Sequence, residues 1–136
     1  YWVTVYNDQE IYFVNPPTAL ESFIVPNDTA QILSHSKIYL TYNPTQNIDL
    51  SLIQSRAYSF LSSFGIQTFL ACTEEEGCPD IPIIDCKTDH GIIFLQDNET
   101  TSISSNGNCL ELQALNIDTM QRQLERAFYS MLGIME

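Results

Sequence analysis

One stretch of the chain alternates regularly between helix and strand, and this order constrains the fold more than any other feature. Residues 28–33 predict a short helix and residues 37–42 predict a strand. A longer helix follows over residues 50–64, and residues 66–71 read as a buried strand. Helices and strands that alternate with short connections are typical of a sheet with parallel strands and helices packed on it. This half of the chain therefore predicts an α/β layer.

The helix over residues 50–64 has the clearest pattern in this half. Its apolar residues recur at helical spacing, and they share one face: Leu50, Ile53, Ala57, Phe60, Leu61 and Phe64. Asn47 or Asp49 can cap the start of this helix, and Gly65 suits the left-handed position beyond its end. In the short helix, Asp28 followed by Gln31 predicts a capping box.

The second half of the chain predicts further strands. Residues 81–84 and 91–96 are apolar strand candidates. Residues 102–105 and 108–112 flank Asn106-Gly107, which is the strongest short-range hairpin signal in the chain. These residues predict an antiparallel hairpin at the far edge of the sheet.

The last segment predicts an amphipathic helix, with Asp118 as its cap. Its apolar residues follow the helical period: Met120, Leu124, Ala127, Phe128 and Met131. Together the elements predict one α/β domain over residues 1–136. It is a sandwich in which helices pack on a mixed sheet, with a parallel β-α-β part and an antiparallel hairpin.

Aromatic and β-branched residues crowd the first segment. Residues 2–6 and 10–14 read as strands, so residues 1–17 predict either a hairpin or a strand exchanged with a neighbouring copy. Core packing accounts for some of these aromatic side chains. Exposed Tyr and Trp residues are also typical of protein contacts, because they bury a large area at low entropy cost. We expect a protein interface at four residues: Tyr1, Trp2, Tyr6 and Tyr12.

Charge excludes several classes of partner. The 136 residues include seventeen acids and five bases, which give a net charge of −12. Binding to DNA or RNA phosphates needs clusters of Lys and Arg, and so does binding to an anionic membrane surface. We therefore expect no nucleic-acid partner. No apolar run approaches the roughly 20 residues that a membrane span needs, so we expect no span in this chain.

The four cysteines indicate the compartment. Cys72, Cys78, Cys86 and Cys109 lack the close pairs of a structural zinc site, so disulfides are the stronger interpretation. Free buried cysteines in a cytosolic protein are the alternative, and disulfides also form inside hyperthermophiles. Three connectivities are possible, of which we prefer Cys72–Cys78 with Cys86–Cys109.

Two further features also point outside the cell. Asn27 and Asn98 each begin an N-glycosylation pattern. The first residue is Tyr1 and not Met, which is consistent with removal of a signal or anchor, or with a trimmed sequence. We expect an extracellular or outer-surface protein.

No motif marks an active site or a cofactor site. His90 follows Asp85 and Cys86 closely, so a small secreted hydrolase with a site near Asp85 and His90 is one alternative. A catalytic cysteine must be free, however, and we expect Cys86 to be bridged. We assign no catalytic residue and expect no cofactor.

The acidic loop over residues 74–80 suggests a second alternative. Glu74, Glu75, Glu76 and Asp80 carry carboxylates that can bind a divalent cation, or the loop can bind a small molecule. Consecutive glutamates point in different directions, however, so a solvated face is the simpler interpretation. We assign no metal ligand here.

Three segments together resemble a known class of protein. The runs at residues 79–86, 107–109 and 132–135 resemble the outward-facing C-terminal domains of small uncharacterised archaeal membrane or surface proteins. The resemblance covers about the last half of the chain and includes no catalytic motif. It implies an extracytoplasmic location and a membrane anchor that precedes this domain.

These features favour a non-enzymatic domain that acts through protein contacts. It would be a subunit of a surface assembly or filament, or the outer domain of a membrane complex. Its partners would be proteins, as a homo-oligomer or within an anchored complex.

Overall fold

The computed structural model describes residues 2–44, 51–87 and 90–135, and it shows an α/β fold with a separate hairpin. The elements follow one another in this order: β1 Trp2–Tyr6, β2 Gln9–Phe13, the 3₁₀ helix η1 Pro17–Leu20, α1 Thr29–Leu33, β3 Lys37–Tyr42, α2 Ser51–Ser63, β4 Gln67–Cys72, β5 Gly91–Asp97, β6 Ser102–Asn106, β7 Cys109–Ala114 and α3 Ile117–Met131.

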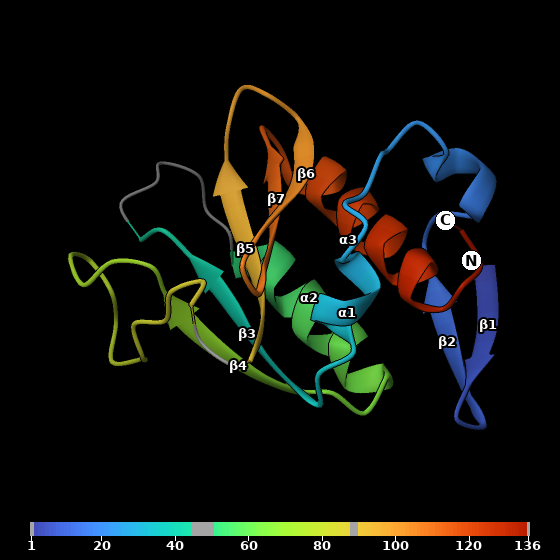
Figure 1. Cartoon of the computed structure of the whole chain (residues 1–136), viewed down its shortest axis with the longest axis horizontal. Coiled ribbons are helices and arrows are strands. Elements are labelled where there is room, and N and C mark those ends of the chain that lie inside the picture. Colours follow the sequence, from blue (N-terminus) through green and yellow to red (C-terminus); the bar gives the residue numbers. More distant parts are fainter. Residues whose placement is uncertain (1, 45–50, 88–89, 136) are drawn as a thin grey trace.

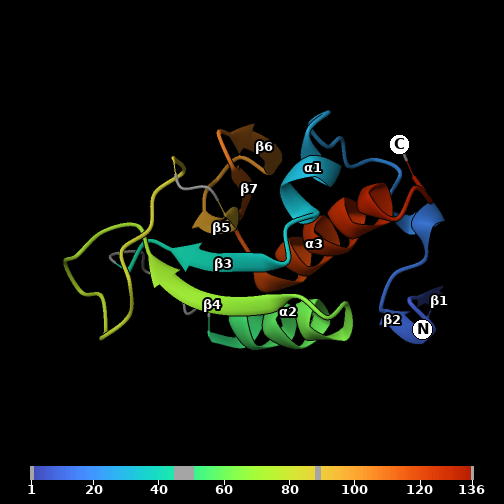
Figure 2. The same cartoon turned by 60° about the horizontal axis from the view of Figure 1, so that its bottom comes forward.

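A five-stranded mixed sheet forms the first layer, with the strand order β4-β3-β5-β7-β6 (Figure 1). The pairs β3–β4, β3–β5 and β5–β7 are parallel, and β6 pairs with β7 in the antiparallel sense. In sequence α2 lies between β3 and β4, and it packs along β4 (Figure 2). The predicted fold class is confirmed, including the hairpin at the far edge.

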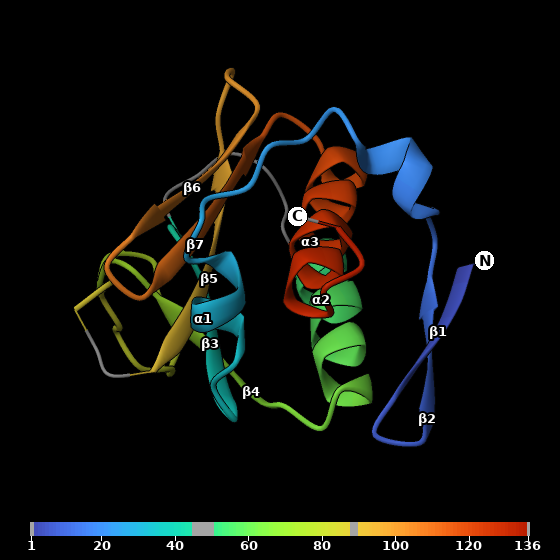
Figure 3. The same ribbon diagram turned by 45° about the vertical axis from the view of Figure 1, so that its right-hand side comes forward.

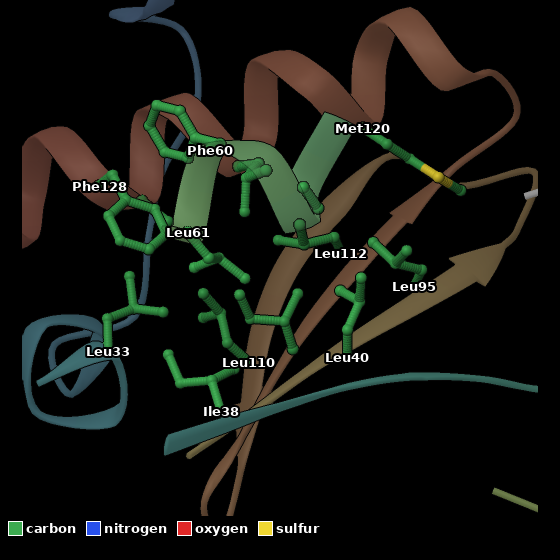
Figure 4. Packing of buried hydrophobic residues seen from close by; sticks show 14 of the residues in the cluster. Leu33, Ile38, Leu40, Phe60, Leu61, Leu95, Leu110, Leu112, Met120 and Phe128 are labelled. Atoms are coloured by element: carbon green, nitrogen blue, oxygen red, sulfur yellow. The ribbon is translucent and has the colours of Figure 1, made fainter. Parts of the chain in front are cut away.

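The three α-helices of the described chain pack on one face of this sheet. The strand register places Ile38, Leu40 and Leu110 on that face, where they meet Leu61 of α2 and Phe128 of α3 (Figure 4). These side chains are buried, so the sheet and the helices share one apolar core.

The close approach of α1 to the sheet requires a glycine at the start of β5. A Cβ atom added to Gly91 would lie 2.5 Å from the carbonyl oxygen of Ile32 in α1. Any larger residue would push α1 away from the sheet. The sequence pattern gave Gly91 no such role, because the approach of α1 is a tertiary contact.

The hairpin of β1 and β2 forms a third layer on the far side of the helices (Figure 3). Phe13 stacks on Tyr129 of α3 with 4.1 Å between ring centroids, and it meets Phe60 of α2 edge-on. Ile11 is also buried. Helix α3 therefore lies between the sheet and the hairpin, and it is buried on both sides.

An irregular segment, and not a helix, connects β4 to β5 across the sheet face opposite α1, α2 and α3. Strands β4 and β5 flank β3 and run parallel, so a right-handed connection must pass over the face that the helices leave open. Thr41 and Ile92 point to this face, yet both are 1% exposed. Cys86 of the connection forms a disulfide with Cys109 on the same face, with 5.1 Å between Cα atoms. The disulfide therefore fastens an irregular segment where other folds place a helix.

The second disulfide joins Cys72 and Cys78 and closes the acidic loop. The two bonds are the pairs that the sequence favoured, and no described cysteine is free. Disulfides of this kind are consistent with an oxidising compartment. None of the described helices is both long and apolar enough to cross a bilayer.

One predicted strand is wrong. Residues 81–84 make only an isolated bridge between Ile83 and Cys72, flanked by bonds from Cys72 N to Pro82 O and from Ile84 N to Cys72 O. Pro79 and Pro82 have no N–H group to donate, so a longer ladder cannot form there.

Several predicted caps and turns also need correction. The turn between β6 and β7 consists of Gly107 and Asn108, one residue later than expected, and Gly107 has φ +60°. A glycine at the first turn position is typical of a type II′ hairpin. Asn116 caps α3 by accepting from Thr119 N at 2.8 Å, so Asp118 lies in the first turn. The Asp28 side chain makes no capping bond.

Asn47 and Asp49, the predicted caps of α2, lie outside the described residues. Gly65 has φ +75° just beyond α2, as the sequence predicted for the left-handed position after the helix.

Replacing both Cys86 and Cys109 by alanine will lower the free energy of unfolding by about 3 kcal/mol, because this bond closes the longer loop. Replacing Cys72 and Cys78 will lower it by about 2 kcal/mol. Guanidinium denaturation without reductant measures both losses. A larger loss of unfolding free energy when Cys72–Cys78 is removed would contradict the role of Cys86–Cys109 as the main stabilising link of the β4–β5 connection.

Candidate functional site

The β1–β2 hairpin is a two-stranded sheet that is separate from the main sheet. Its turn residues Asn7 and Asp8 both have positive φ, at 50° and 64°, which is the geometry of a type I′ turn. The register pairs Trp2 with Phe13 and Thr4 with Ile11. In the described chain β1 pairs with β2 alone, so one edge of β1 carries no ladder.

The two faces of the hairpin differ. Ile11 and Phe13 face the helices, whereas Val3, Val5 and Tyr12 share the outer face. Val5 is 66% exposed and Tyr12 is 55% exposed. The outer face is therefore mainly apolar and open to solvent, and it also carries the exposed carboxylate of Glu10 opposite Val5. We call the outer face together with the free edge of β1 the hairpin surface.

The structure divides the four aromatic residues of the expected interface. Trp2 and Tyr12 are exposed. Tyr6 packs on Phe64, just after α2, with 5.3 Å between ring centroids, and so contributes to the core. Tyr1 lies outside the described residues. The sequence does not mark Val3 and Val5 as outward-facing, because alternation alone does not tell which face of an isolated hairpin is covered.

A buried carboxylate holds the hairpin against α3. Glu125 is fully buried, and its oxygens accept hydrogen bonds from Val14 N at 2.7 Å, Asn15 N at 3.0 Å and Asn15 Nδ2 at 2.7 Å. Gln121 Nε2 also donates to Glu125 at 3.4 Å. A buried carboxylate needs such donors, because its desolvation is otherwise costly. Nothing in the sequence marks Glu125, since an amphipathic helix would place it in water.

Tyr129 adds a second contact between α3 and the end of the hairpin. Its hydroxyl donates to the carbonyl oxygen of Asn15 at 2.7 Å, and its ring stacks on Phe13. Burial raises the pKa of Tyr129 well above its usual value, and the nearby charge of Glu125 raises it further.

Arg126 fixes the segment that follows the hairpin. Its Nε donates to the carbonyl oxygen of Phe23 at 3.1 Å, and its Nη1 donates to Ser130 Oγ at 2.8 Å. Burial lowers the pKa of Arg126. The adjacent residues Glu125 and Arg126 of α3 thus bind two different segments, one at Val14–Asn15 and one at Phe23.

A groove of about 720 Å³ lies beside these contacts, between β2, α2 and α3. Tyr12 and Val14 line it from the hairpin, Arg56 lines it from α2, and Gln121 and Arg122 line it from α3. Its volume falls in the range of roughly 300–1,000 Å³ that small-ligand sites occupy. No sequence pattern predicts this groove, since its walls come from three distant segments.

The structure gives the Asp85–His90 pair no shared site. Asp85 accepts from Lys87 N at 2.9 Å in a local turn, and it lines a hollow to which His90 does not belong. The ring of His90 lies against Tyr39, with 5.6 Å between ring centroids. Among the described residues, no contact joins the two side chains that a hydrolase would need together.

The acidic loop is likewise open to solvent at Glu74, Glu75 and Glu76. Within residues 2–44, 51–87 and 90–135, no three His, Cys, Asp or Glu side chains gather closely enough to hold a metal ion. The geometry thus adds no support for cation binding by this loop.

The two glycosylation patterns lie in different settings. Asn27 is exposed, just before α1. Asn98 is half-buried, and its Nδ2 donates to Gln113 Oε1 at 3.1 Å while its Oδ1 accepts from Thr100 N at 3.2 Å. A glycan on Asn98 would compete with these bonds, so Asn27 is the better acceptor.

No family model, no curated protein and no solved structure matches this chain.

Replacing Glu125 by glutamine will lower the free energy of unfolding by about 2 kcal/mol, because a neutral amide offers only one acceptor to three strong donors. Glu99→Gln, which removes the same charge at an exposed position, is the matched control and will change stability by less than about 0.5 kcal/mol. Urea denaturation at neutral pH compares the two. Equal effects of both substitutions would exclude Glu125 as the anchor of the hairpin.

Stability will depend on alkaline pH through Tyr129. Its pKa is higher in the folded than in the unfolded chain, so its contribution is complete below about pH 10, the unfolded pKa, and is lost as pH rises above that value. Tyr129→Phe will reduce the fall in unfolding free energy between pH 9 and pH 11, as measured by denaturation at each pH. An unchanged slope would show that Tyr129 ionises as easily in the folded chain as in the unfolded one.

Proposed function

We propose that this chain is an extracytoplasmic assembly domain whose copies pair through strand β1. The observation that carries the proposal is the hairpin surface: a mainly apolar outer face and a strand edge without a ladder partner among the described residues. Natural proteins usually protect such edges, because they bind other strands. The two disulfides support a location outside the reducing cytoplasm, and Asn27, the first residue of a sequon, is exposed.

The two edges of the five-stranded sheet are less suited to pairing. Edge strand β6 is polar, with the sequence Ser-Ile-Ser-Ser-Asn. Edge strand β4 is covered near Cys72 by the bonds to Pro82 and Ile84, and Lys37 Nζ lies 4.7 Å from the centre of the Phe69 ring on this strand. Lysine beside an edge is a common protection against unwanted pairing.

The sequence of β1 favours a second copy of the same chain as the partner. Strand β1 reads Trp-Val-Thr-Val-Tyr and has no charge, although the whole chain carries −12. Repulsion between two such chains is weakest where neither carries charge. An acidic or basic partner would need charged contacts that β1 does not offer.

The register of the hairpin allows one symmetric arrangement. Tyr6 and Gln9 close a two-residue turn and therefore form a hydrogen-bonded pair, so the N–H and C=O groups of Val3 and Val5 point to the free edge. Two antiparallel copies of β1 can then face each other about Thr4. Val3 pairs with the second copy's Val5, and Trp2 lies opposite its Tyr6. This pairing is closed and two-fold, as most homodimers are.

A single added cysteine tests this register. In the paired strands Thr4 faces Thr4 of the second copy at a non-hydrogen-bonded position, where Cα atoms lie about 4.5 Å apart, within disulfide range. Thr4→Cys will form an intermolecular disulfide under mild oxidation, seen by non-reducing electrophoresis. Val5→Cys is the matched control: Val5 is more exposed than Thr4, but two copies of it lie about 8 Å apart, too far for a disulfide.

Analytical ultracentrifugation of the unmodified chain and of Val5→Lys measures how strongly each one dimerises. Val5 points outward, so lysine there leaves the fold intact and weakens the dimer about tenfold or more by placing charge in the pairing strand. Faster cross-linking of Val5→Cys than of Thr4→Cys would indicate random collision and would contradict the proposed register. A strictly monomeric parent chain at all concentrations would overturn the proposal.

A further inference from the structure

We infer that Trp2 anchors the pairing of two copies, with its indole ring packed against Tyr6 of the second copy. This inference rests on the proposed pairing through β1, and it names the side-chain contact that holds the two strands together. It follows from the order of residues in β1, the free ring of Trp2 and the fixed ring of Tyr6.

The sequence of β1 is nearly the same in both directions. Trp-Val-Thr-Val-Tyr reads as aromatic, Val, Thr, Val, aromatic from either end. Two antiparallel copies centred on Thr4 therefore align each residue with one of its own kind. A register shifted by two residues would place one ring opposite Thr4 and leave the other ring without an opposite residue in β1. The two aromatic residues thus favour the centred register over its neighbours.

The positions of the two rings in β1 suit a direct contact. Trp2 lies opposite Phe13, which faces the helices. Tyr6 lies four residues further along β1, so its ring is on the same face. Both residues are two positions from Thr4 and share its non-hydrogen-bonded type, where side chains of paired strands lie closest. Cross-strand aromatic pairs stabilise such positions, and the symmetric pair contains this contact twice.

Trp2 has apolar surface left to bury. Its side chain is 45% exposed and takes part in none of the ring contacts of the described chain. The rings behind the hairpin instead form one connected cluster of Tyr6, Phe13, Phe60, Phe64, Phe128 and Tyr129. Trp2 of a second copy would join this cluster at Tyr6. Tryptophan is a frequent anchor of interfaces, because it buries a large area at low entropy cost.

Tyr6 offers a ring that is already fixed in place. It meets Phe64 with an angle of 61° between the ring planes, and Phe64 stacks on Phe128 of α3 with 4.8 Å between centroids. Phe64 and Phe128 are buried, whereas Tyr6 is half-buried, so part of its ring remains open. Packing within one copy therefore orients Tyr6 before the second copy binds, which lowers the entropy cost of pairing.

The fluorescence of Trp2 measures this contact, because Trp2 is the only tryptophan of the chain. Its emission will shift to shorter wavelength, and acrylamide will quench it less, as the protein concentration rises. Both changes will occur over the concentrations at which the ultracentrifuge detects the dimer. Val5→Lys, which weakens pairing, will move both changes to higher concentration.

Variants of Trp2 separate the ring contact from strand pairing as such. Trp2→Thr keeps a residue that favours strands but removes the ring, and it will weaken the dimer about tenfold or more. Trp2→Phe keeps a ring and will retain most of the affinity. Tyr12→Thr is the matched control, because it removes an exposed ring from the outer face of β2, and it will change the affinity less than about twofold. Urea denaturation of dilute protein checks that each variant folds.

Two outcomes would overturn the inference, and they differ in what they mean for the proposed function. Equal dimer affinities of Trp2→Thr and Tyr12→Thr would exclude Trp2 as the anchor and leave pairing through β1 in place. A parent chain that stays monomeric, with Trp2 emission independent of concentration, would overturn both the anchor and the pairing.

Discussion

The buried carboxylate of Glu125 is the contact on which the position of the N-terminal hairpin depends. A two-stranded hairpin is marginal on its own in water, so it needs a surface on which to pack. Glu125 binds the chain where β2 ends, at Val14 and Asn15, and Tyr129 binds the Asn15 carbonyl from the next turn of α3. With β2 fixed in this way, β1 becomes the outer strand and its free edge faces away from the core.

Helix α3 can hold the hairpin because it is packed on both sides. Toward the sheet, Leu124 and Phe128 enter the main core, and Gln123 Nε2 donates to the carbonyl oxygens of Ser102 and Gln113. Toward the hairpin, Glu125 and Tyr129 make the contacts described above. A helix buried on both sides needs internal partners for its polar side chains. Backbone groups of the neighbouring segments bind Gln123 Nε2, Glu125 and Arg126, whereas Gln121 Oε1 and Gln123 Oε1 have no partner among the described residues.

The local pattern of the chain was sufficient for the sheet and insufficient for the site. The β-branched and apolar run at residues 37–42 predicted β3 with its observed bounds, and the helix before Gly65 followed from apolar spacing. Cysteine spacing favoured the observed disulfides. Residues 81–84 failed as a strand because prolines remove ladder donors. Glu125 and the groove depend on contacts between segments more than a hundred residues apart, which no local period encodes.

Amide hydrogen exchange of β1 and of the Val14–Asn15 segment measures both the Glu125 anchor and the free edge of β1 in one experiment. The account predicts that the amides of Val14 and Asn15 are protected at every protein concentration, since Glu125 binds them within one chain. It predicts that the amides of Val3 and Val5 exchange fast in dilute protein and slowly in concentrated protein. Fast exchange at Val14 and Asn15, or exchange at Val3 and Val5 that does not change with concentration, would contradict it.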